Sequence, residues 1–506
     1  MPLYLGLDAS TQSLTALLLE APASSVGPGD DPEVVGGGAK RIVFEHTIDF
    51  DADLPHHGTR HGVLPNDDPV VAHAPPLLWA EALDRMMEAL VGSGVDLSSL
   101  TAIAGSGQQH GSVWLHRRAT AALAALAPSK PLVEQLRGVP TGDAEMPFDS
   151  IFSRRTSPIW MDSSTAEECR EITEAVGGAT ELAHLTGSRA FERFTGPQIR
   201  KLFKQDRNTY QATDRIHLVS SFMASLLAGQ HAPVEPGDAA GMNLMDISTR
   251  DWSPIALQAT APELRDKLPV IVPSSNIVGG LAPYWQQRFG LPPTRIVAWS
   301  GDNPCSLVGT GLFREGQLAV SLGTSDTIFG PMRDPRVDES GTGHVFGAPT
   351  GEFMGLTCFL NGSLARERVR DDYDLDWDGF SDALRSTPPG NDGALMFPWF
   401  APEITPPVDA PAARRVELDV DDGPRNVRAV VEAQMMALAN HSRWMGVDVD
   451  VIHATGGGAA NREILQVMAD VFDAEVRRFA SGNSACLGAA LRALHADRLA
   501  DGRAAA

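Results

Sequence analysis

Short apolar strands and amphipathic helices alternate along most of the chain. Leu3–Leu7 and Leu14–Glu20 are apolar runs on either side of a polar turn, which predicts a β-hairpin, and Ile42–Ile48 alternates as a third strand. Strands that alternate with helices favour an α/β fold. The other predicted strands are Leu100–Ala104, Arg295–Trp299, Gln317–Leu322 and Val449–Ala454, and the predicted helices are Leu77–Val91, Ser164–Val176 and Val427–Ala439.

Two of the predicted hairpins have turns that are rich in hydroxyl groups. The first turn is Asp8–Ser13, and the second is Gly323–Thr327 after the strand Gln317–Leu322. Each hairpin begins about half of the chain, a pattern that is typical of a duplicated fold. The similarity is short, so the duplication needs support from elsewhere.

Composition excludes several classes of protein. The chain has 506 residues, of which 43% are hydrophobic and 21% charged, values that belong to globular proteins of about two to four domains. Its net charge of −23 argues against binding to nucleic acid or to anionic lipid. No apolar run approaches a membrane span, and the N-terminus lacks the basic region of a signal peptide.

The 4 cysteines are scattered and form no C-x-x-C pair, which argues against a zinc ribbon or a thioredoxin-like site. Scattered thiols are typical of a reducing compartment. We therefore expect a soluble protein of the cytoplasm.

The hydroxyl-rich turns are candidate phosphate sites. Small residues at a hairpin tip expose backbone N–H groups that can surround an oxyanion, and the hydroxyls of Ser10 and Thr11 add donors. Gly323 and Thr324 repeat this chemistry in the second hairpin. Asp8, at the end of the first strand, offers the oxygen ligand that Mg²⁺ prefers. A solvent-exposed turn is the alternative for each segment alone.

A third glycine-rich turn, Gly456–Gly458, joins a strand to a helix and would allow a flat ring or a phosphate to approach the backbone closely. An ordinary strand-to-helix turn has the same pattern. The chain contains no G-x-x-x-x-G-K-[ST] motif, which excludes a P-loop enzyme. The glycines of Gly105–Gly111 are spaced one residue too far apart for the dinucleotide fingerprint.

Asp302 is the candidate general base, because it follows an apolar strand and a glycine and would project from the strand end. A helix N-cap is the alternative. Asn303, Gln109 and His110 carry amide and imidazole groups that suit sugar hydroxyls. Arg193 lies among aromatic residues and is a candidate for ligand contact or for an ordinary ion pair.

A histidine-rich stretch contains His56, His57 and His61 in a loop with proline and glycine. Neither a helical i, i+4 pair nor a cysteine accompanies these residues, so the sequence does not predict a metal site there.

Taken in order, these pieces resemble the FGGY carbohydrate kinases, and within that family the mammalian-type branch. The resemblance extends from about Leu3 to about Ala493. The stretches that carry it are Gly107–Gly111, Trp160–Thr165, Gly187–Gly196, Gly301–Pro304, Val320–Thr327 and Asn461–Val467.

The resemblance implies two ribonuclease-H-like, actin-like α/β domains with an active site in the cleft between them. Residues 1–311 would bind the sugar and carry the base, and residues 312–506 would bind the nucleotide. The implied reaction is transfer of the γ-phosphoryl group of ATP to the 5-hydroxyl of D-xylulose, with Mg²⁺ as cofactor. The enzyme would be a phosphotransferase with an alcohol group as acceptor.

The resemblance also implies roles for individual residues. Asp302 would be the base and Asp8 the metal ligand. The sugar would contact Gln109, His110, Arg193, Asp302 and Asn303. ATP would be held by Ser10, Thr11, Gly323, Thr324, Trp377, Gly456, Gly457, Gly458 and Asn461.

The chain departs from the family pattern in places. Gln109 stands where many bacterial members have Met, which favours the mammalian-type branch. Residues 21–40 and 138–149 are expected to be inserted loops, and Gly458–Ala460 replaces bulkier or polar residues in the adenosine segment. A kinase for another ketose or polyol (ribulose, glycerol or an alditol) and a non-catalytic sugar-sensing ATPase are the alternatives. The oligomeric state is open, with a homodimer as one alternative.

Overall fold

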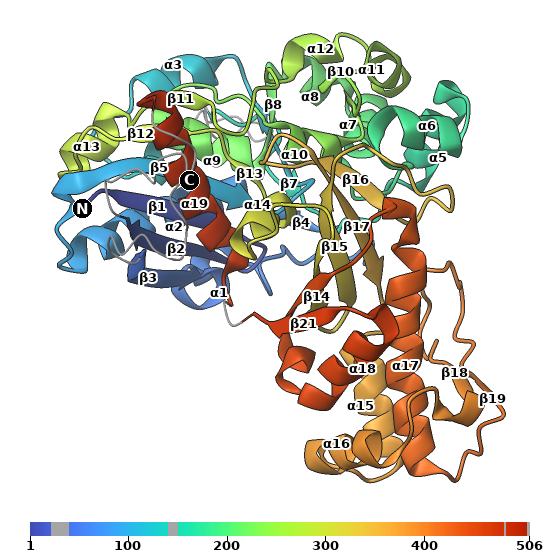
Figure 1. Ribbon diagram of the computed structural model, residues 1–506. Helices are drawn as coiled ribbons and strands as arrows, with labels where there is room; N and C mark the ends of the chain where they lie inside the picture. Colours follow the sequence, from blue (N-terminus) through green and yellow to red (C-terminus); the bar gives the residue numbers. More distant parts are fainter. Residues whose placement is uncertain (22–39, 140–149, 480–481, 503–506) are drawn as a thin grey trace. The chain divides into compact units, whose positions relative to one another are not determined.

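The computed structural model describes residues 1–21, 40–139, 150–479 and 482–502, and they form two compact units (Figure 1). The first unit comprises residues 1–309, 346–351 and 483–506, and the second comprises residues 310–345 and 352–482. The predicted inserted loops fall almost wholly outside the described residues.

The central sheet of the first unit has its hydroxyl-rich hairpin in the middle. The strand order is β11-β12-β5-β1-β2-β3, and β13 also pairs with β5. β1 is antiparallel to β2 and parallel to β5, and β2 is antiparallel to β3. The bounds are β1 Leu3–Ala9, β2 Ser13–Glu20, β3 Arg41–Asp49, β5 Leu100–Gly107, β11 Ile277–Gly280, β12 Arg295–Val297 and β13 Ser300–Gly301.

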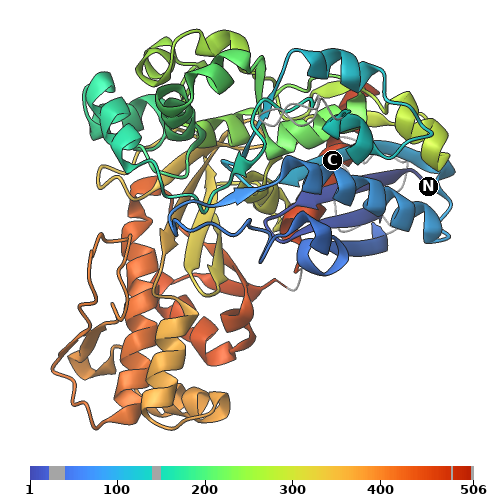
Figure 2. The same cartoon turned by 180° about the vertical axis from the view of Figure 1, so that it is seen from behind.

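Alternation along β1 divides its side chains between two cores. Leu3, Leu5 and Leu7 belong to a large core with the helices α2 (Pro76–Gly92) and α9 (Val219–Ala228). Figure 2 shows α2 over this face of the sheet. The period-2 pattern of the sequence thus places leucine side chains under these two helices.

The other face of the same sheet is covered by α19 (Ser484–Ala500). Tyr4 packs there against Ala490 and Ala493. Gly6 makes this contact possible, because a Cβ at that position would lie 2.2 Å from the backbone carbonyl oxygen of Cys486. The small residues of α19 and the glycine of β1 therefore allow helix and sheet to approach closely.

The sheet of the second unit repeats this topology, with the order β16-β17-β15-β14-β20-β21. β14 is antiparallel to β15 and parallel to β20, as β1 is to β2 and β5, and β15 is antiparallel to β17. The structure therefore confirms the duplicated fold. The bounds are β14 Gln317–Leu322, β15 Asp326–Met332, β16 His344–Gly347, β17 Phe353–Phe359, β20 Val451–Thr455 and β21 Glu475–Arg478.

Further helices and short strands complete both units. In the second unit they are α15 Ser363–Asp372, α16 Trp377–Ser386, β18 Leu395–Phe397, β19 Arg414–Val416, α17 Gly423–His441 and α18 Arg462–Phe472. In the first unit they are α1 Phe50–Asp53, β4 His73–Ala74, β6 Ser112–Leu115, α3 Arg118–Ala124, α4 Leu132–Arg137, β7 Ser157–Pro158, α5 Ala166–Val176, α6 Ala179–Thr186, α7 Thr195–Gln205, α8 Arg207–Ala212, β8 Arg215–Leu218, α10 Pro236–Ala239, β9 Met245–Asp246, β10 Asp251–Trp252, α11 Pro254–Thr260, α12 Leu264–Lys267, α13 Pro283–Phe289 and α14 Asp302–Gly309.

The division of the chain differs from the single break predicted between residues 311 and 312. The first stretch of the chain ends at Gly309, close to that break, but residues 483–506 return to the first unit. The physical reason is the packing of α19 on the first sheet, where the buried Arg492 donates hydrogen bonds to the carbonyl oxygens of Ala298 at 2.7 Å and Ser274 at 3.1 Å. Within the described residues, no helix is both long enough and apolar enough to cross a membrane.

Candidate active site

Asp8 lies at the carboxyl end of β1, beside the neighbouring strand β5. The register places it opposite Ser106, whose hydroxyl donates a hydrogen bond to Asp8 Oδ1. Ser10 donates a second hydrogen bond to Oδ2 at 2.6 Å. Burial raises the pKa of Asp8, and the two serine hydroxyls oppose this shift. The carboxylate is thus fixed by the turn that the sequence pattern singled out.

Asp302 is the first residue of α14 and follows β13 directly. Its Oδ1 accepts a hydrogen bond from the backbone N–H of Asn303 at 2.9 Å. Burial raises the pKa of Asp302 to about 7, and the negative charge of Asp8 contributes to the shift. A carboxyl group with this pKa can accept a proton near neutral pH and hold it. The helix-start geometry and the base role are therefore compatible.

A side-chain amide links Asp302 to the end of β5. Asn303 Nδ2 donates to Gln109 Oε1 at 2.8 Å, and Gln109 Nε2 donates to the carbonyl oxygen of Gly237 at 3.2 Å. Gly301 leaves space for this amide, because a Cβ there would lie 2.4 Å from Gln109 Cγ. The structure therefore brings together Gln109, Asn303 and Asp302, three residues that the family resemblance assigns to the sugar site.

His110 has a backbone φ of 71°, an unusual conformation for a residue other than glycine. Its Nδ1 lies 2.7 Å from the carbonyl oxygen of Gly241, so Nδ1–H is the donor and Nε2 is an acceptor. Burial lowers the pKa of His110 to about 3, and the charge of Arg193 adds to the effect. His110 is thus a neutral imidazole, suited to accept a hydrogen bond from a hydroxyl group.

Arg193 lies against aromatic rings, with its guanidinium carbon 4.8 Å from the ring centroid of Phe191 and 5.5 Å from that of Phe194. The Phe194 ring also lies 4.5 Å from the His110 ring. Arg193 and His110 therefore belong to one cluster, although only the family resemblance placed both residues at the sugar site.

The first hairpin tip is held by a tryptophan. Trp160 Nε1 donates a hydrogen bond to Thr11 Oγ1 at 2.8 Å. Ser10 closes the turn through its backbone N–H, which donates to the carbonyl oxygen of Ser13 at 3.0 Å. The hydroxyl groups of Ser10 and Thr11 thus occupy defined positions in the first unit.

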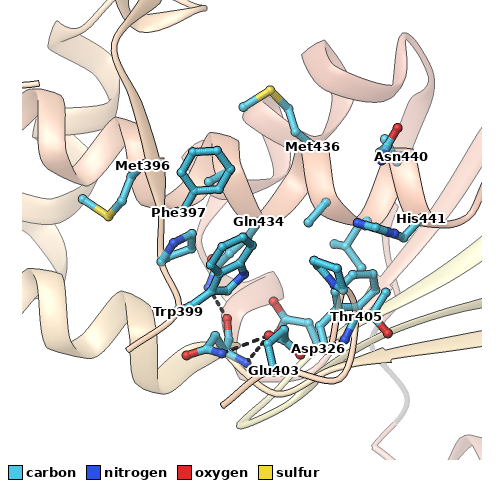
Figure 3. Close-up of a pocket in the computed structure, with 18 of the residues that line it drawn as sticks. Asp326, Met396, Phe397, Trp399, Glu403, Thr405, Gln434, Met436, Asn440 and His441 are labelled. Atoms are coloured by element: carbon cyan, nitrogen blue, oxygen red, sulfur yellow. Dashed lines mark hydrogen bonds between the residues drawn. The ribbon is translucent and has the colours of Figure 1, made fainter. Parts of the chain in front are cut away.

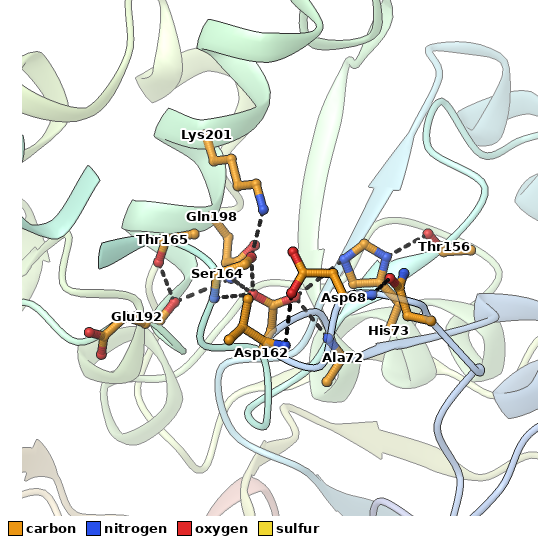
Figure 4. Close-up of polar contacts among 12 residues, drawn as sticks. Asp68, Ala72, His73, Thr156, Asp162, Ser164, Thr165, Glu192, Gln198 and Lys201 are labelled. Atoms are coloured by element: carbon orange, nitrogen blue, oxygen red, sulfur yellow. Dashed lines mark hydrogen bonds and ion pairs between the residues drawn. The ribbon is translucent and has the colours of Figure 1, made fainter. Parts of the chain in front are cut away.

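A network around Asp162 supports the segment that carries Trp160 (Figure 4). Asp162 is fully buried and accepts hydrogen bonds from the backbone N–H of Ala72 at 3.0 Å and from Gln198 Nε2 at 2.7 Å. Burial alone would raise the pKa of Asp162, but hydrogen bonds from His73, Ser164 and Gln198 lower it overall. Asp162 therefore stays ionised and fixes three separate segments.

Two buried acids near Asp302 were missed by the sequence reasoning. Glu235 accepts hydrogen bonds from the hydroxyls of Ser274 and Ser300, and Asp238 accepts one from Ser220. Burial raises the pKa of Asp238 well above its usual value. Both acids lie in a segment with proline and glycine that reads locally as a loop, and only the fold places them near the end of β13.

The second unit contains a cavity of about 790 Å³ at the corresponding hairpin. The turn after β14, the starts of α15 and α16, and the turn between β20 and α18 all contribute to it. The lining residues are Leu322, Gly323, Thr324, Ser363, Arg366, Glu367, Trp377, Asp378, Ser381, Arg385, Gly457, Gly458, Ala460, Asn461, Arg462, Glu463 and Ile464. The predicted nucleotide-binding residues of this unit line one cavity, except for Gly456.

Gly456 supports the turn instead. Its φ is 83°, and a Cβ there would lie 2.6 Å from the carbonyl oxygen of Leu322. Asn461 caps α18 by accepting hydrogen bonds from the backbone N–H groups of Glu463 at 3.0 Å and Ile464 at 3.3 Å. A helix N-terminus therefore faces this cavity, and helix N-termini favour anions.

Trp377 begins α16 and offers an aromatic face, with 42% of the residue exposed. The guanidinium of Arg370 lies 4.7 Å from its ring centroid, and Phe380 packs edge-on at 5.3 Å. The indole is thus held in place while part of it remains accessible for stacking on a planar ligand.

A buried ion pair forms part of the cavity wall. Arg366 donates to both carboxylate oxygens of Asp326, at 2.8 Å and 3.1 Å, and to Gln434 Oε1 at 2.9 Å. Asp326 and Gln434 also line a second cavity of about 570 Å³ near α17 and β18 (Figure 3). The pair therefore lies between these two cavities.

Comparison with known proteins agrees with this architecture. Residues 155–309 match the N-terminal domain, and residues 318–496 the C-terminal domain, of the FGGY family of carbohydrate kinases. The chain belongs to this family. It is accordingly a phosphotransferase with two domains of the actin-like, ribonuclease-H-like fold, acting on an alcohol group of a carbohydrate.

Two curated relatives are similar over nearly the whole chain. Xylulose kinase from Mus musculus is 42% identical over 97% of this chain and 85% of its own length. Xylulose kinase 2 from Arabidopsis thaliana is 40% identical over 97% of this chain and 87% of its own. The crystal structure of xylulose kinase from Rhodospirillum rubrum shares the fold at 16% identity, with a TM-score of 0.77 over 98% of this chain and 90% of that chain.

Proposed function

We propose that the protein is an ATP-dependent kinase that transfers the γ-phosphoryl group to the 5-hydroxyl of D-xylulose. The observation that carries the proposal is the position of Asp302 at a helix start, beside Asn303 and Gln109 and within the electrostatic influence of Asp8. The names of the curated relatives from Mus musculus and Arabidopsis thaliana support the choice of sugar.

In the proposed mechanism, Asp302 orients the 5-hydroxyl and accepts its proton as the phosphoryl group is transferred. Asn303, Gln109, His110 and Arg193 bind the remaining sugar oxygens. The neutral His110 accepts a hydrogen bond from a sugar hydroxyl at Nε2, and the amide and guanidinium groups donate hydrogen bonds. Together these contacts fix the sugar in one orientation, which lowers the entropic part of the activation barrier for phosphoryl transfer.

Mg²⁺ fits the donor set around Asp8, because a carboxylate oxygen with nearby hydroxyl oxygens is the kind of ligand that hard cations prefer. When bound, the ion would neutralise charge on the phosphates. The hydroxyls and backbone N–H groups of Ser10, Thr11, Gly323 and Thr324 hold phosphate oxygens in this proposal.

The nucleoside part of ATP occupies the cavity of the second unit in this proposal. Trp377 packs on the planar base, and Gly457, Gly458 and Asn461 contact the adenosine, with Gly456 shaping the turn. The 4 cysteines of the chain are thiols rather than disulfides, which supports a reducing location, and we place the reaction in the cytoplasm.

A coupled assay of ADP release tests the substrate assignment. We expect release to depend on added sugar and kcat/KM to be highest for D-xylulose among D-xylulose, D-ribulose, L-xylulose, glycerol and xylitol. A higher kcat/KM for one of the other compounds would reassign the kinase within its family. Sugar-independent hydrolysis of ATP at the full rate would contradict the kinase reaction.

The pH dependence tests the base. Because Asp302 must be ionised to accept a proton and its pKa is raised to about 7, kcat/KM for the sugar is expected to fall about tenfold per pH unit below that value. The pKa of His110 is lowered to about 3, so His110 does not titrate in this range. A flat profile from about pH 5.5 to 8 would contradict the assignment.

Asp8→Asn tests the metal ligand. Loss of one carboxylate oxygen is expected to raise the Mg²⁺ concentration for half-maximal rate by at least about tenfold and to lower kcat. Because the charge of Asp8 raises the pKa of Asp302, the acid limb of the residual activity is expected to move to lower pH. An unchanged Mg²⁺ titration would remove Asp8 from the metal role.

A further inference from the structure

A cluster of three possible metal ligands lies in the first unit, apart from the proposed catalytic residues. His56 and His57 come from a single 3₁₀ turn, Pro55–His57, and Glu81 comes from α2. The Nε2 atoms of His56 and His57 lie 2.8 Å and 2.9 Å from the same carboxylate oxygen, Glu81 Oε2. The three ligand atoms all lie within 4.8 Å of one another.

We propose that His56, His57 and Glu81 form a binding site for a divalent transition-metal ion, with Zn²⁺ as the best match. Two imidazole nitrogens and one carboxylate oxygen are a known zinc ligand set, with bonds of about 2.0–2.2 Å. Ligand atoms that surround one ion at such distances lie about 3–4 Å apart, so only small side-chain movements are needed. Mg²⁺ prefers oxygen ligands and does not compete well for this set.

The exposure of the three side chains suits an ion that enters from solvent. The side chain of His57 is 7% exposed and that of Glu81 is 16% exposed, whereas that of His56 is 54% exposed. Two ligands are therefore held in place by packing, and the third can turn toward an arriving ion. Three protein ligands leave the fourth tetrahedral position to water.

The site would tie a segment near the first hairpin to α2. Within that segment, Asp51 accepts hydrogen bonds from Thr59 Oγ1 at 2.7 Å and from the backbone N–H of Gly62 at 3.3 Å. Gly62 packs so closely on the hairpin that a Cβ would lie 1.8 Å from the carbonyl oxygen of Thr11. A metal ion at His56, His57 and Glu81 would thus stabilise the segment that packs against the turn containing Thr11.

Neighbouring cations are expected to limit the affinity. Arg85 Nη2 lies 4.0 Å from the second carboxylate oxygen of Glu81, and the charge of Arg137 acts on His57. These positive charges oppose the binding of a divalent cation. We therefore expect a Kd for Zn²⁺ in the micromolar range, weaker than that of a structural zinc site.

The test uses the full-length protein without a histidine tag, stripped with EDTA and kept in excess Mg²⁺. Titration with Co²⁺ should produce a visible absorption band with the high molar absorption coefficient of tetrahedral Co²⁺. The band should saturate at one ion per chain, and Zn²⁺ should displace the Co²⁺. Zn²⁺ should also raise Tm relative to EDTA, because a ligand that binds the native state stabilises it.

Three variants distinguish this site from adventitious binding. His56→Gln and Glu81→Gln should each weaken binding at least tenfold, whereas His61→Asn, a control at an exposed histidine of the same segment, should bind as the wild type does. His56 is largely exposed, so its substitution should leave the fold and the sugar-kinase rate without zinc unchanged. Absence of a tetrahedral band in the wild type, or equal binding by His56→Gln, would overturn the proposal.

Discussion

Replacement of Asp302 by alanine is expected to lower kcat by about 10²–10⁴-fold, the usual loss when a general base is removed. Asp302 Oδ1 is held by the backbone N–H of Asn303, and its pKa is raised to about 7, so the group is both positioned and able to accept the proton. Binding of ADP should stay within about threefold of the wild type, because the cavity lined by Trp377 and Asn461 belongs to the second unit.

Steady-state kinetics and calorimetric titration with ADP check this expectation. Asp246→Asn is a suitable control, since this acid is in the same unit but its side chain caps a turn, accepting from the backbone N–H groups of Ser248 at 2.9 Å and Thr249 at 3.0 Å. Its kcat should be nearly normal. If Asp302→Ala kept a near-normal kcat with an unchanged KM, Asp302 would not be the base.

Removal of one partner of the buried pair Asp326–Arg366 is expected to have the largest effect on stability. Asp326→Ala should lower the free energy of unfolding by about 3–5 kcal/mol, because it leaves a guanidinium buried without its counter-charge. The side chains of Arg366 and Asp326 are 1% and 2% exposed. Arg366→Met should cost less, because burial already raises the pKa of Asp326 and the carboxyl group can be protonated once the arginine is gone.

Urea unfolding of both variants and of the double variant Asp326→Ala/Arg366→Met measures these differences. The double variant should be more stable than Asp326→Ala alone. Arg314→Gln is the matched control, because the ion pair Arg314–Asp450 is in the same unit at 2.8 Å with side chains 57% and 52% exposed, and it should cost less than about 1 kcal/mol. If Asp326→Ala and Arg314→Gln lowered the free energy of unfolding equally, the buried ion pair would not have the larger effect on stability that we expect.

The sequence alone predicted the parts of the fold that local pattern controls. The strand predicted at Gln317–Leu322 is β14 with the same bounds, and the helix predicted at Leu77–Val91 is α2 within one residue at each end. Both depend on the period of the apolar side chains, which reports burial on one face. The return of α19 to the first sheet was not predicted, because nothing in residues 484–500 specifies which sheet the helix will cover.

Local sequence also predicted part of the candidate site, namely the residues at strand ends. Asp302 and Gly323 follow apolar strands, so their positions at strand ends could be read locally. Glu235 and Asp238 could not be identified in this way, since a carboxylate in a proline–glycine segment normally faces solvent. Glu81 was missed for the related reason that a helical glutamate shows no sign of the histidines 24 and 25 residues before it.

The packing of α19 sets an order for folding during synthesis. The hydrogen bond from Tyr4 to Asp497, at 3.0 Å, joins residues 493 positions apart in the chain. During synthesis, the face of the N-terminal sheet on which α19 packs cannot be covered until residues 484–500 have been made, after every residue of the second unit. The first unit therefore completes its core only at the end of synthesis, and until then an apolar sheet face lacks its native helix.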